Sequence, residues 1–241
     1  MVIPARMGAE RLPGKPLLAE TGKPLVVHTL EAARRSRRAR RVLVATDDAR
    51  IADAVRSAGG EAVMTSPSCR SGTDRVAEAA LAHPGEDLVL NVQGDEPEID
   101  PGHLDSLIEA MERDPSIPMG TLAAPLASEA EALEPSVVKV VVNGAGDALY
   151  FSRAAIPFRR DPAGPARPMR HVGVYAFRRG FLEEFAALPE TPLERTEGLE
   201  QLRALEHGRR IRVVPVDRAP PGIDTREDYE AFVRRRREGR D

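Results

Sequence analysis

The sequence predicts an α/β fold built on a doubly wound, mostly parallel sheet. Apolar segments rich in β-branched residues alternate with amphipathic segments of helical period, and turn residues stand at the junctions. The polar motifs follow directly after the apolar segments, which is where ligands bind in sheets of this class. The chain has 241 residues and a single cysteine, so it is long enough to bury a core and has no cysteine pair for a disulfide.

The first half of the chain alternates strands and helices regularly. Residues 41–46 ("RVLVAT") have the composition of a buried strand, and residues 47–59 predict a helix because Asp stands at the start and Gly at the end. By the same reasoning, strands are predicted at 61–65 and 87–93, and helices at 26–38, 73–83 and 100–113.

The second half continues with shorter elements. Segment 137–142 ("VVKVVV") is more apolar than a half-buried strand needs, which fits either a fully buried strand or a strand that contributes to a dimer interface. Residues 159–170, rich in proline and arginine, predict a long loop. The other strands are predicted at 119–124, 148–152, 172–177 and 211–216, and the helices at 180–187, 194–206 and 225–237.

Charge and hydropathy narrow the classes of partner. The net charge is −3, so the chain has no excess of positive charge that would favour a nucleic-acid partner. No apolar run approaches the roughly 20 residues of a membrane span. No charged-then-apolar signal segment precedes the first motif, so we expect a cytoplasmic protein.

Residues 4–16 ("PARMGAERLPGKP") lie where the first loop after a strand belongs. Prolines deny this stretch regular structure, and Gly8 and Gly14 let backbone N–H groups turn toward a ligand. Its cations Arg6, Arg11 and Lys15 are suited to phosphate. The spacing differs from that of the ATPase phosphate loop. The stretch predicts either a phosphate-binding loop or a solvated charged loop.

Three further motifs carry polar residues. In "NVQGDEP" (91–97) an apolar strand is followed by Asp95 and Glu96, which are oxygen ligands suited to Mg²⁺ or else part of a helix-entry turn. In "PPGIDTREDYEAF" (220–232), Asp224 on its own is better explained as a helix N-cap than as a metal ligand. The turn "RSGTDR" (70–75) on its own indicates only an N-cap.

An ordered set of motifs closely resembles the 3-deoxy-manno-octulosonate (Kdo) cytidylyltransferases. Each motif alone is weak, but the set spans nearly the whole chain in one order. The motifs are "VIPAR", "RLPGKPL", "VATDD", "SGTDR", "NVQGDEP", "VKVV", "ALYFSRAAIP", "HVGVYAFR", "LEQLR" and "GIDTRED".

The resemblance implies an enzyme that transfers CMP from CTP to the anomeric hydroxyl of Kdo, releasing pyrophosphate. It also implies a need for Mg²⁺, a role in lipopolysaccharide biosynthesis, and a cytosolic homodimer. The implied architecture is one domain like the nucleotide-diphospho-sugar transferases, Rossmann-like in its core. Residues 1–125 and 205–241 would form the nucleotide-binding core, and residues from about 126 to 204 a sugar-binding and dimerisation subdomain.

The resemblance assigns roles to individual residues. Lys15, Arg6, Asp95 and Asp224 would be catalytic, and Asp95 and Asp224 would hold the magnesium. The other residues expected to bind the nucleotide are Pro4, Ala5, Arg11, Ser71, Gly72, Asp74 and Gln93. The sugar would be bound by Arg153, His171, Tyr175, Glu200 and Gln201.

The residues of the sugar site also have plainer explanations. Arg153 would pair with a surface acid. His171 and Tyr175 would be buried at even spacing on one face of a strand. Glu200 and Gln201 would be exposed residues of a helix. Met7 and Cys69 depart from the family pattern. A nucleophilic role for Cys69 is not expected, because the reaction needs no covalent intermediate.

Two other functions are compatible with parts of the pattern, and a third is disfavoured by it. The first is a cytidylyltransferase for another acidic sugar, such as 8-amino-Kdo or a sialic-acid-like substrate. The second is a GT-A-like glycosyltransferase, which would require a D-x-D-like metal motif. The third is a catalytically silent binding module, which predicts loss of the carboxylates and cations that are present here.

Overall fold

The computed structural model describes residues 1–8, 11–161 and 168–239, and its backbone falls into two compact units. Unit 1 comprises Met1–Asp105 and Pro220–Asp241, and unit 2 comprises Ser106–Ala219. The sequence prediction divided the chain at 125/126 and 204/205 instead. The assignment of sugar binding and dimerisation to the second part stays a prediction.

Unit 1 is built on parallel strands whose apolar residues are buried. Strand β1 (Val2–Ala5) pairs in parallel with β2 (Leu43–Thr46), and every residue of both strands is buried. On its other side β1 pairs in parallel with β4 (Leu88–Asn91), while β2 pairs with β3 (Glu61–Met64). The predicted parallel α/β arrangement is confirmed in this unit, and the sheet as a whole is mixed.

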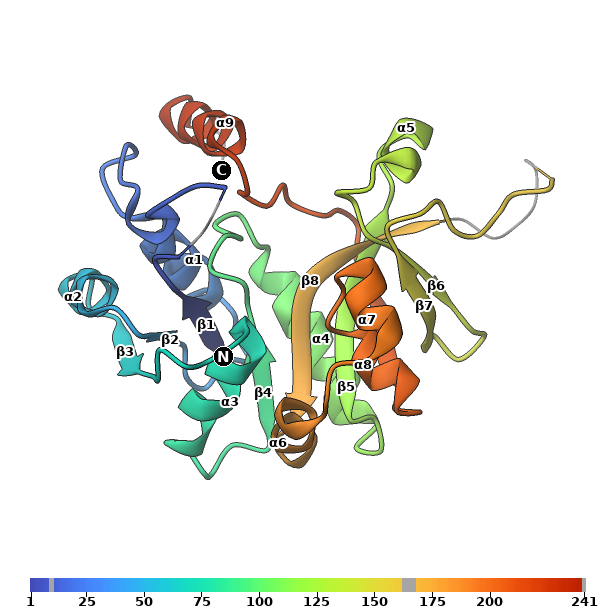
Figure 1. Cartoon of the computed structure of the whole chain (residues 1–241). Coiled ribbons are helices and arrows are strands. Elements are labelled where there is room, and N and C mark those ends of the chain that lie inside the picture. Colours follow the sequence, from blue (N-terminus) through green and yellow to red (C-terminus); the bar gives the residue numbers. More distant parts are fainter. Residues whose placement is uncertain (9–10, 162–167, 240–241) are drawn as a thin grey trace. The chain divides into compact units, whose positions relative to one another are not determined.

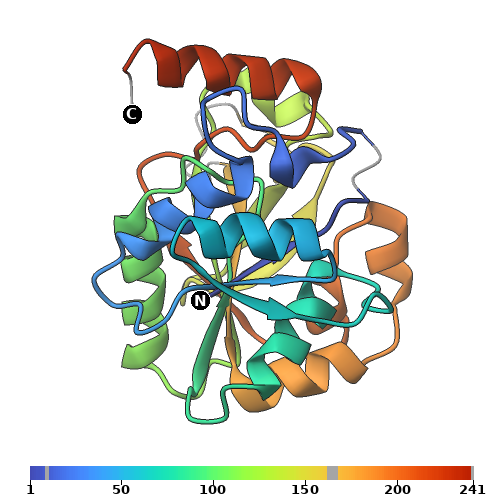
Figure 2. The same ribbon diagram turned by 90° about the vertical axis from the view of Figure 1, so that its left-hand side faces the viewer.

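Helices follow the strands of unit 1 as the sequence predicts. The side chain of Asp48 caps α2 (Ala49–Ser57) and that of Ser71 caps α3 (Gly72–Leu81), each by accepting a backbone N–H. Figure 2 shows α2 in front of the strands of this unit. The remaining elements are the short 3₁₀ helix η1 (Lys15–Leu17), α1 (Leu25–Arg34) and α9 (Arg226–Arg237), while α4 (Pro101–Arg113) contains the boundary with unit 2.

Unit 2 contains mainly antiparallel pairs (Figure 1). Strand β8 (Met169–Arg178) pairs antiparallel with β5 (Met119–Pro125), which also pairs in parallel with β9 (Ile211–Pro215). Strand β6 (Lys139–Val142) pairs antiparallel with both β7 (Ala148–Ser152) and β8. Its helices after α4 are α5 (Glu129–Leu133), α6 (Arg179–Ala187), α7 (Pro192–Glu197) and α8 (Leu202–Glu206).

Some predicted elements are wrong. The single helix expected at 194–206 is two helices, because Gly198 adopts the left-handed conformation (φ 62°) and ends α7. Loop 4–16 is not wholly irregular, since its first two residues end β1 and Lys15 begins η1. Part of the predicted loop 159–170 lies outside the described residues, and β8 already begins at Met169.

Helix α9 packs against the segment that follows β1. Leu12, Leu25 and Ile223 form one buried cluster with side chains of α9, and Leu18 packs against it. Figures 1 and 2 both show α9 beside the blue segment that contains residues 11–24. The last helix of the chain therefore holds the loop that carries Lys15. No helix among the described residues is long and apolar enough to cross a membrane.

Lys139 is a fully buried cation in unit 2. Its ammonium donates hydrogen bonds to the backbone carbonyls of Glu134 (3.0 Å), Val137 (2.7 Å) and Arg153 (2.5 Å). Burial lowers the pKa of this ammonium. Val140 is also fully buried, as an internal strand requires, while the proposed dimer role of "VVKVVV" stays a prediction.

We expect Lys139→Met to lower the free energy of unfolding by about 2–4 kcal/mol, because three buried carbonyls lose their donor. Urea unfolding followed by circular dichroism measures the change. Lys23→Met is the matched control, since Lys23 is half exposed and pairs with Glu31, and it should change the value by less than about 1 kcal/mol. Equal effects of the two substitutions would contradict this structural role of Lys139.

Candidate active site

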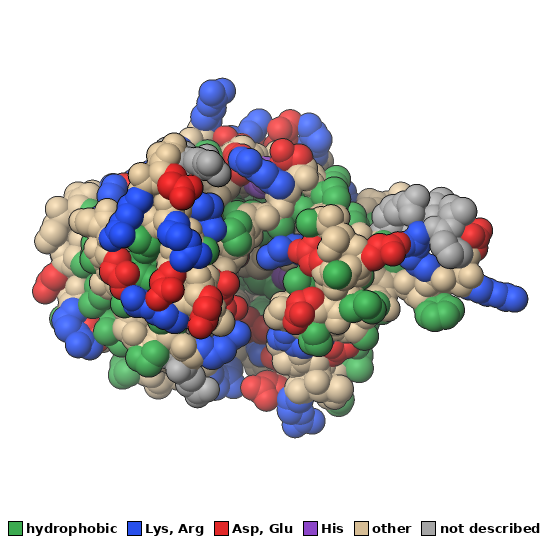
Figure 3. Space-filling view, turned by 90° about the horizontal axis from the view of Figure 1, so that it is seen from above, with side chains coloured by type: hydrophobic (Ala, Val, Ile, Leu, Met, Phe, Trp, Pro, Cys, Tyr) green, Lys and Arg blue, Asp and Glu red, His purple; other side chains and the backbone are tan. Residues whose placement is uncertain are grey.

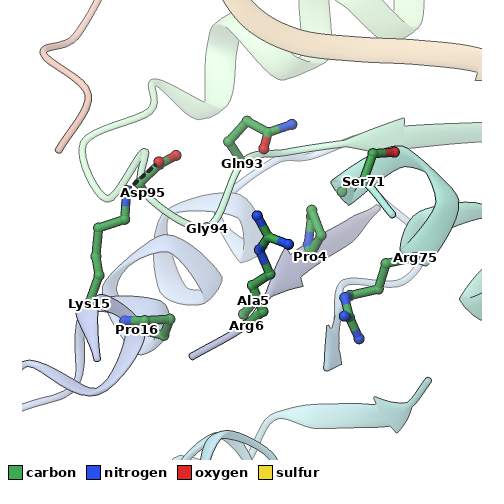
Figure 4. A pocket seen from close by; sticks show the side chains of 11 residues that line it. Pro4, Ala5, Arg6, Lys15, Pro16, Ser71, Arg75, Gln93, Gly94 and Asp95 are labelled. Carbon is green, nitrogen blue, oxygen red and sulfur yellow. Dashed lines mark hydrogen bonds and ion pairs between the residues drawn. The ribbon is translucent and has the colours of Figure 1, made fainter. Parts of the chain in front are cut away.

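A pocket in unit 1 opens at the carboxyl ends of β1 and β4 (Figure 4). Side chains from three segments that are far apart in the sequence line it, which is the expected place for a ligand in a parallel sheet. The lining residues are Pro4, Ala5, Arg6, Lys15, Pro16, Ser71, Gly72, Arg75, Gln93, Gly94 and Asp95. Eight of the predicted site residues are among them.

The backbone at the pocket floor is closely packed. A Cβ atom on Gly94 would lie 2.9 Å from the carbonyl oxygen of Pro4, so only glycine fits there. The carbonyl of Gly94 accepts a hydrogen bond from the Thr29 hydroxyl at 3.0 Å. The loop that carries Asp95 is thereby fixed against both β1 and α1.

The amide of Gln93 is also held in place. Its nitrogen donates to the Asn91 side-chain oxygen at 3.1 Å, and the Asn91 nitrogen donates to the Thr73 hydroxyl at 3.2 Å. Asn91 and Thr73 are buried, so the chain of hydrogen bonds runs from the interior to the pocket. This arrangement leaves the Gln93 oxygen on the pocket side as an acceptor suited to an amino group.

Lys15 points into the acidic end of the pocket. Gly14, in the left-handed conformation (φ 70°), turns the chain into η1, where Lys15 is the first residue. The Lys15 ammonium nitrogen lies 2.7 Å from Asp95 Oδ2 and 3.4 Å from Asp224 Oδ1. Figure 4 shows a dashed line between the side chains of Lys15 and Asp95 at one side of the pocket.

The N-terminus of α9 brings Asp224 to Asp95. The Ile223 amide donates to the Asp95 carbonyl at 3.0 Å, which joins two segments that no local sequence signal connects. The alternative explanation of Asp224 as the N-cap is wrong. Thr225 caps α9 in a capping box with Asp228, and the Asp224 carboxylate is therefore available for Lys15 and for Arg11, which lies 3.1 Å away.

Helix α9 also clamps the segment after η1. The Tyr229 hydroxyl accepts the Glu20 amide at 2.9 Å, and Arg226 pairs with the Glu20 carboxylate at 2.5 Å. Tyr229 is fully buried, and its burial raises the pKa of the phenol. Lys15 and Asp224 are thus positioned by the same helix.

Two residues predicted to bind the nucleotide do not line the pocket. Arg11 pairs with Asp224, and its side chain is 68% exposed. Asp74 accepts from the Arg70 amide and guanidinium at 3.1 Å each, which is a local structural role at the start of α3. The nucleotide roles of both residues stay predictions.

Sequence reasoning missed Arg75, Pro16 and Gly94 in the lining. The Arg75 guanidinium is buried and pairs with Asp47 at 2.9 Å, and it also bonds the Thr65 hydroxyl at 2.5 Å. The sequence did contain a signal for Arg75 as a site residue, because Arg75 ends the motif "SGTDR" and its partner Asp47 belongs to the motif "VATDD". A fixed positive charge is thereby added to the wall of the pocket.

The carboxylates of Asp95 and Asp224 suit a cation whose other ligands are water and substrate oxygens. No group of three His, Cys, Asp or Glu side chains that could hold a metal is found in the described ranges. Asp95 and Asp224 nevertheless contact one ammonium, so their oxygens converge on a site already occupied by positive charge. Mg²⁺ commonly takes one or two protein carboxylates and completes its shell with phosphates and water, so the two residues fit it.

The predicted sugar residues all lie in unit 2. Arg153 donates its guanidinium to the carbonyls of Glu197 (2.7 Å), Pro135 (3.0 Å) and Gly198 (3.4 Å). Its backbone N–H bonds the Glu197 carboxylate at 3.0 Å. Desolvation raises the pKa of Glu197, but this bond and the bond from the Ser152 hydroxyl (2.6 Å) hold that pKa below its usual value. The expected pairing of Arg153 with a surface acid is thus replaced by carbonyl contacts, and its contact with sugar stays a prediction.

His171 and Tyr175 face the same side of β8, as their even spacing predicts. Their ring centroids are 5.4 Å apart. The Thr121 hydroxyl lies 2.8 Å from the Val174 carbonyl, to which it donates its single proton, and 2.9 Å from His171 Nε2. Nε2 must therefore carry the proton that Thr121 accepts, and Nδ1 is left as an acceptor.

Glu200 and Gln201 stand between α7 and α8. Glu200 acts electrostatically on Tyr175 and raises the pKa of its phenol further, after desolvation has raised it most. Gln201 is only 3% exposed, so the explanation of the pair as exposed helix residues is wrong for Gln201. Its side-chain nitrogen has no hydrogen-bond partner among the described residues. Buried donors are normally hydrogen-bonded, so this nitrogen could donate to a ligand.

Cys69 is not prepared for nucleophilic chemistry. Its sulfur lies 3.1 Å from the Glu78 carboxylate. Desolvation, together with that carboxylate, raises the pKa of the thiol to about 11. The thiol therefore remains protonated at neutral pH, which agrees with the expectation that Cys69 is not a nucleophile.

A family model described as cytidylyltransferase matches residues 1–211. A 3-deoxy-manno-octulosonate cytidylyltransferase of Anaeromyxobacter sp. (strain Fw109-5) is 54% identical over 232 residues, covering 95% of this chain and 93% of the relative. The enzyme of the same name from Escherichia coli is 49% identical over 226 residues, covering 93% and 90%.

Solved structures agree with these relatives. A CMP:2-keto-3-deoxy-manno-octonic acid synthetase complexed with CTP has a TM-score of 0.94 and 46% identity, covering 99% of this chain and 98% of the other. A cytidylyltransferase from Leptospira borgpetersenii has a TM-score of 0.63 at 20% identity, covering 96% and 83%, and shares the fold alone.

We expect the His171 imidazole to stay neutral between about pH 5 and pH 8, because desolvation lowers its pKa to about 3. The folded-state pKa lies below the unfolded value of about 6.5, so the free energy of unfolding decreases as the pH falls below 6.5. Nitrogen-15 NMR of the ring measures this, with His171→Gln to assign the signal. A signal that titrates near pH 6.5 would contradict a desolvated ring bonded to Thr121.

Proposed function

Because the chain belongs to the cytidylyltransferase family, and within it to the 3-deoxy-manno-octulosonate cytidylyltransferases, we propose that it transfers CMP from CTP to the anomeric hydroxyl of Kdo. Pyrophosphate leaves, and the product CMP-Kdo serves lipopolysaccharide biosynthesis. The observation that carries the proposal is the convergence of Lys15, Asp95 and Asp224 at the carboxyl edge of the parallel strands.

The reaction needs positioning and charge neutralisation rather than a covalent intermediate. The anomeric oxygen forms a bond to the α-phosphorus, the bond from that phosphorus to the oxygen bridging to the β-phosphate breaks, and the hydroxyl proton is released. Negative charge accumulates on the departing pyrophosphate. Fixed cations aimed at that charge lower the barrier because they need no reorganisation during the step.

The pocket of unit 1 supplies these groups. Arg6 and Lys15 face the triphosphate, and Arg11 joins them from the exposed part of the loop. Pro4 and Ala5 place backbone groups beside the cytosine, and Gln93 presents its oxygen to the amino group of the base. Ser71 and Gly72, at the start of α3, offer backbone N–H groups at a helix N-terminus, which favours phosphate or ribose oxygens.

Asp95 and Asp224 would hold Mg²⁺. When bound there, the ion neutralises phosphate oxygens and makes a coordinated sugar hydroxyl more acidic. The protein's own contribution is to keep the two carboxylates in register through the backbone hydrogen bond from Ile223 to Asp95.

The polar residues of unit 2 suit an acidic, hydroxyl-rich sugar. The unpaired Gln201 amide nitrogen can donate to a carboxylate or hydroxyl oxygen, and His171 Nδ1 can accept from a hydroxyl. Tyr175 and Glu200 lie beside them and add a phenol and a second acceptor. The Arg153 guanidinium now donates to backbone carbonyls. If it releases them, it would supply positive charge to the sugar carboxylate.

We also propose that the enzyme is a cytoplasmic homodimer with no nucleic-acid partner. Unit 2 exposes large apolar side chains at Leu133 (75%), Leu149 (60%) and Phe158 (90%), which a second copy would cover. The charges do not favour nucleic acid, because Figure 3 shows acidic and basic side chains interspersed on the viewed face of unit 1 and the net charge is −3.

Pyrophosphate release tests the function. With Mg²⁺, we expect release from CTP and Kdo, and none when UTP replaces CTP or N-acetylneuraminate replaces Kdo. Asp95→Asn should lower the rate at least about 100-fold, because transition-state charge loses its partner. Asp53→Asn is the matched control, since Asp53 is 74% exposed on α2, and it should keep the wild-type rate.

Two results would contradict the proposal. Release with N-acetylneuraminate but not with Kdo would assign the enzyme to another acidic sugar. A wild-type rate in Asp95→Asn would remove the carboxylate from the reaction. An 8-amino-Kdo substrate, run beside Kdo, separates the two closest sugars.

A further inference from the structure

The ammonium of Lys15 has no hydrogen-bonding capacity left for a substrate. An ammonium has three donors, and here the acceptors are Asp95 Oδ2 at 2.7 Å, the Ile223 carbonyl at 2.7 Å and Asp224 Oδ1 at 3.4 Å. The Lys15 side chain is only 14% exposed, and its contact with Asp95 is more sheltered from solvent than its contact with Asp224, whose side chain is 51% exposed. To contact a phosphate, Lys15 must release at least one of them.

The second oxygen of Asp224 is engaged in the same way. Arg11 lies 3.1 Å from Asp224 Oδ2, while Lys15 lies on Oδ1. Two cations of the phosphate loop therefore neutralise the carboxylates that would hold the metal. The charges needed for a triphosphate and the charges needed for a divalent cation are paired with each other.

The backbones that carry the two carboxylates are tied together. The amide of Ile223 bonds the Asp95 carbonyl at 3.0 Å, and the adjacent Asp224 amide bonds the Asp228 carboxylate at 3.1 Å. Without Lys15, two like charges would stand on adjoining segments of backbone, and the position between them would attract a divalent cation. A cation that enters while Lys15 is present must displace the ammonium first.

We propose that Lys15 is an internal counter-ion that makes the binding of metal and the binding of nucleotide depend on each other. This inference rests on the proposed function. The triphosphate draws Lys15 and Arg11 away from the carboxylates, and the uncovered carboxylates then take the divalent cation. Free metal and metal-free nucleotide each bind weakly, because each alone must break the internal ion pairs and leaves one set of charges without a partner.

Linkage makes the effect reciprocal. If nucleotide raises the affinity for metal by some factor, metal raises the affinity for nucleotide by the same factor. The counter-ion also keeps the empty site from being filled by free divalent cations. Helix α9 supports this arrangement, because Asp224 lies in the turn directly before it and its residues contact the segment after η1.

The test is a titration of the nucleotide-free protein with Mn²⁺, with free metal measured by electron paramagnetic resonance. We expect Lys15→Met to bind Mn²⁺ at least about 10-fold more tightly than wild type, since a buried positive charge beside the site is removed. Lys15→Gln is a second neutral variant should the first fold poorly. Lys15→Met with Asp95→Asn should lose the gain.

Lys23→Met is the matched control. It removes the same charge from the same unit, but Lys23 pairs with Glu31 in a half-exposed position, so its Mn²⁺ affinity should equal that of wild type. A gain in this control equal to that of Lys15→Met would show a general charge effect and overturn the proposal. Equal Mn²⁺ affinities of wild type, Lys15→Met and Lys15→Gln would also overturn it.

Pyrophosphate release on the same wild-type sample separates this inference from the proposed function. A sample that releases pyrophosphate from CTP and Kdo, but whose Mn²⁺ affinity is unchanged by both Lys15 substitutions, overturns the counter-ion role alone. A sample that releases none overturns the proposed function, and the inference fails with it.

Discussion

The Lys15 ammonium is the contact on which the site of unit 1 depends. It joins Asp95, 80 positions away in the sequence, and Asp224, 209 positions away. The three residues come from three different segments at the carboxyl edge of the parallel strands. The loop after β1 supplies the cation, the end of β4 supplies one carboxylate, and the turn before α9 supplies the other. The C-terminal helix therefore supports the candidate site by holding the turn that carries Asp224, although it contains no residue of the pocket lining.

The physical logic of the site is neutralisation. A nucleotidyl transfer needs strong positive and strong negative groups side by side, and in the absence of substrate such groups pair with each other. The Arg75–Asp47 pair differs, because the Arg75 guanidinium is buried in the wall and also bonds the Thr65 hydroxyl. The pocket thus combines a buried cation in its wall, Arg75, with Lys15, which pairs with the carboxylates at its acidic end.

Much of this could be predicted from the sequence. The alternation of apolar and amphipathic segments is a local signal, so the parallel α/β core of unit 1 followed from it. The ordered motifs located Lys15, Asp95 and Asp224. The cap of α9 could not be assigned in advance, because Asp224 and Thr225 are both good N-caps and only the capping box with Asp228 decides between them. The break at Gly198 was missed because glycine inside an amphipathic pattern is compatible with a helix until its φ is known.

The sugar residues show the same division. Even spacing on β8 predicted that His171 and Tyr175 share a face, but the tautomer of His171 depends on Thr121, which is 50 positions away. Nor does the sequence reveal that Gln201 is buried with an unpaired amide nitrogen, or that carbonyl groups engage Arg153. Such facts depend on tertiary packing, which the periodicity of the sequence does not reveal.

The position of the new bond tests the reaction most directly. Kdo carrying oxygen-18 at its anomeric hydroxyl would be converted with unlabelled CTP, and phosphorus-31 NMR would locate the label through its isotope shift. Attack of the sugar on the α-phosphorus predicts the label in the bond between sugar and phosphorus of CMP-Kdo, with none in pyrophosphate. Label in pyrophosphate, or a product whose phosphorus carries no label, would contradict it.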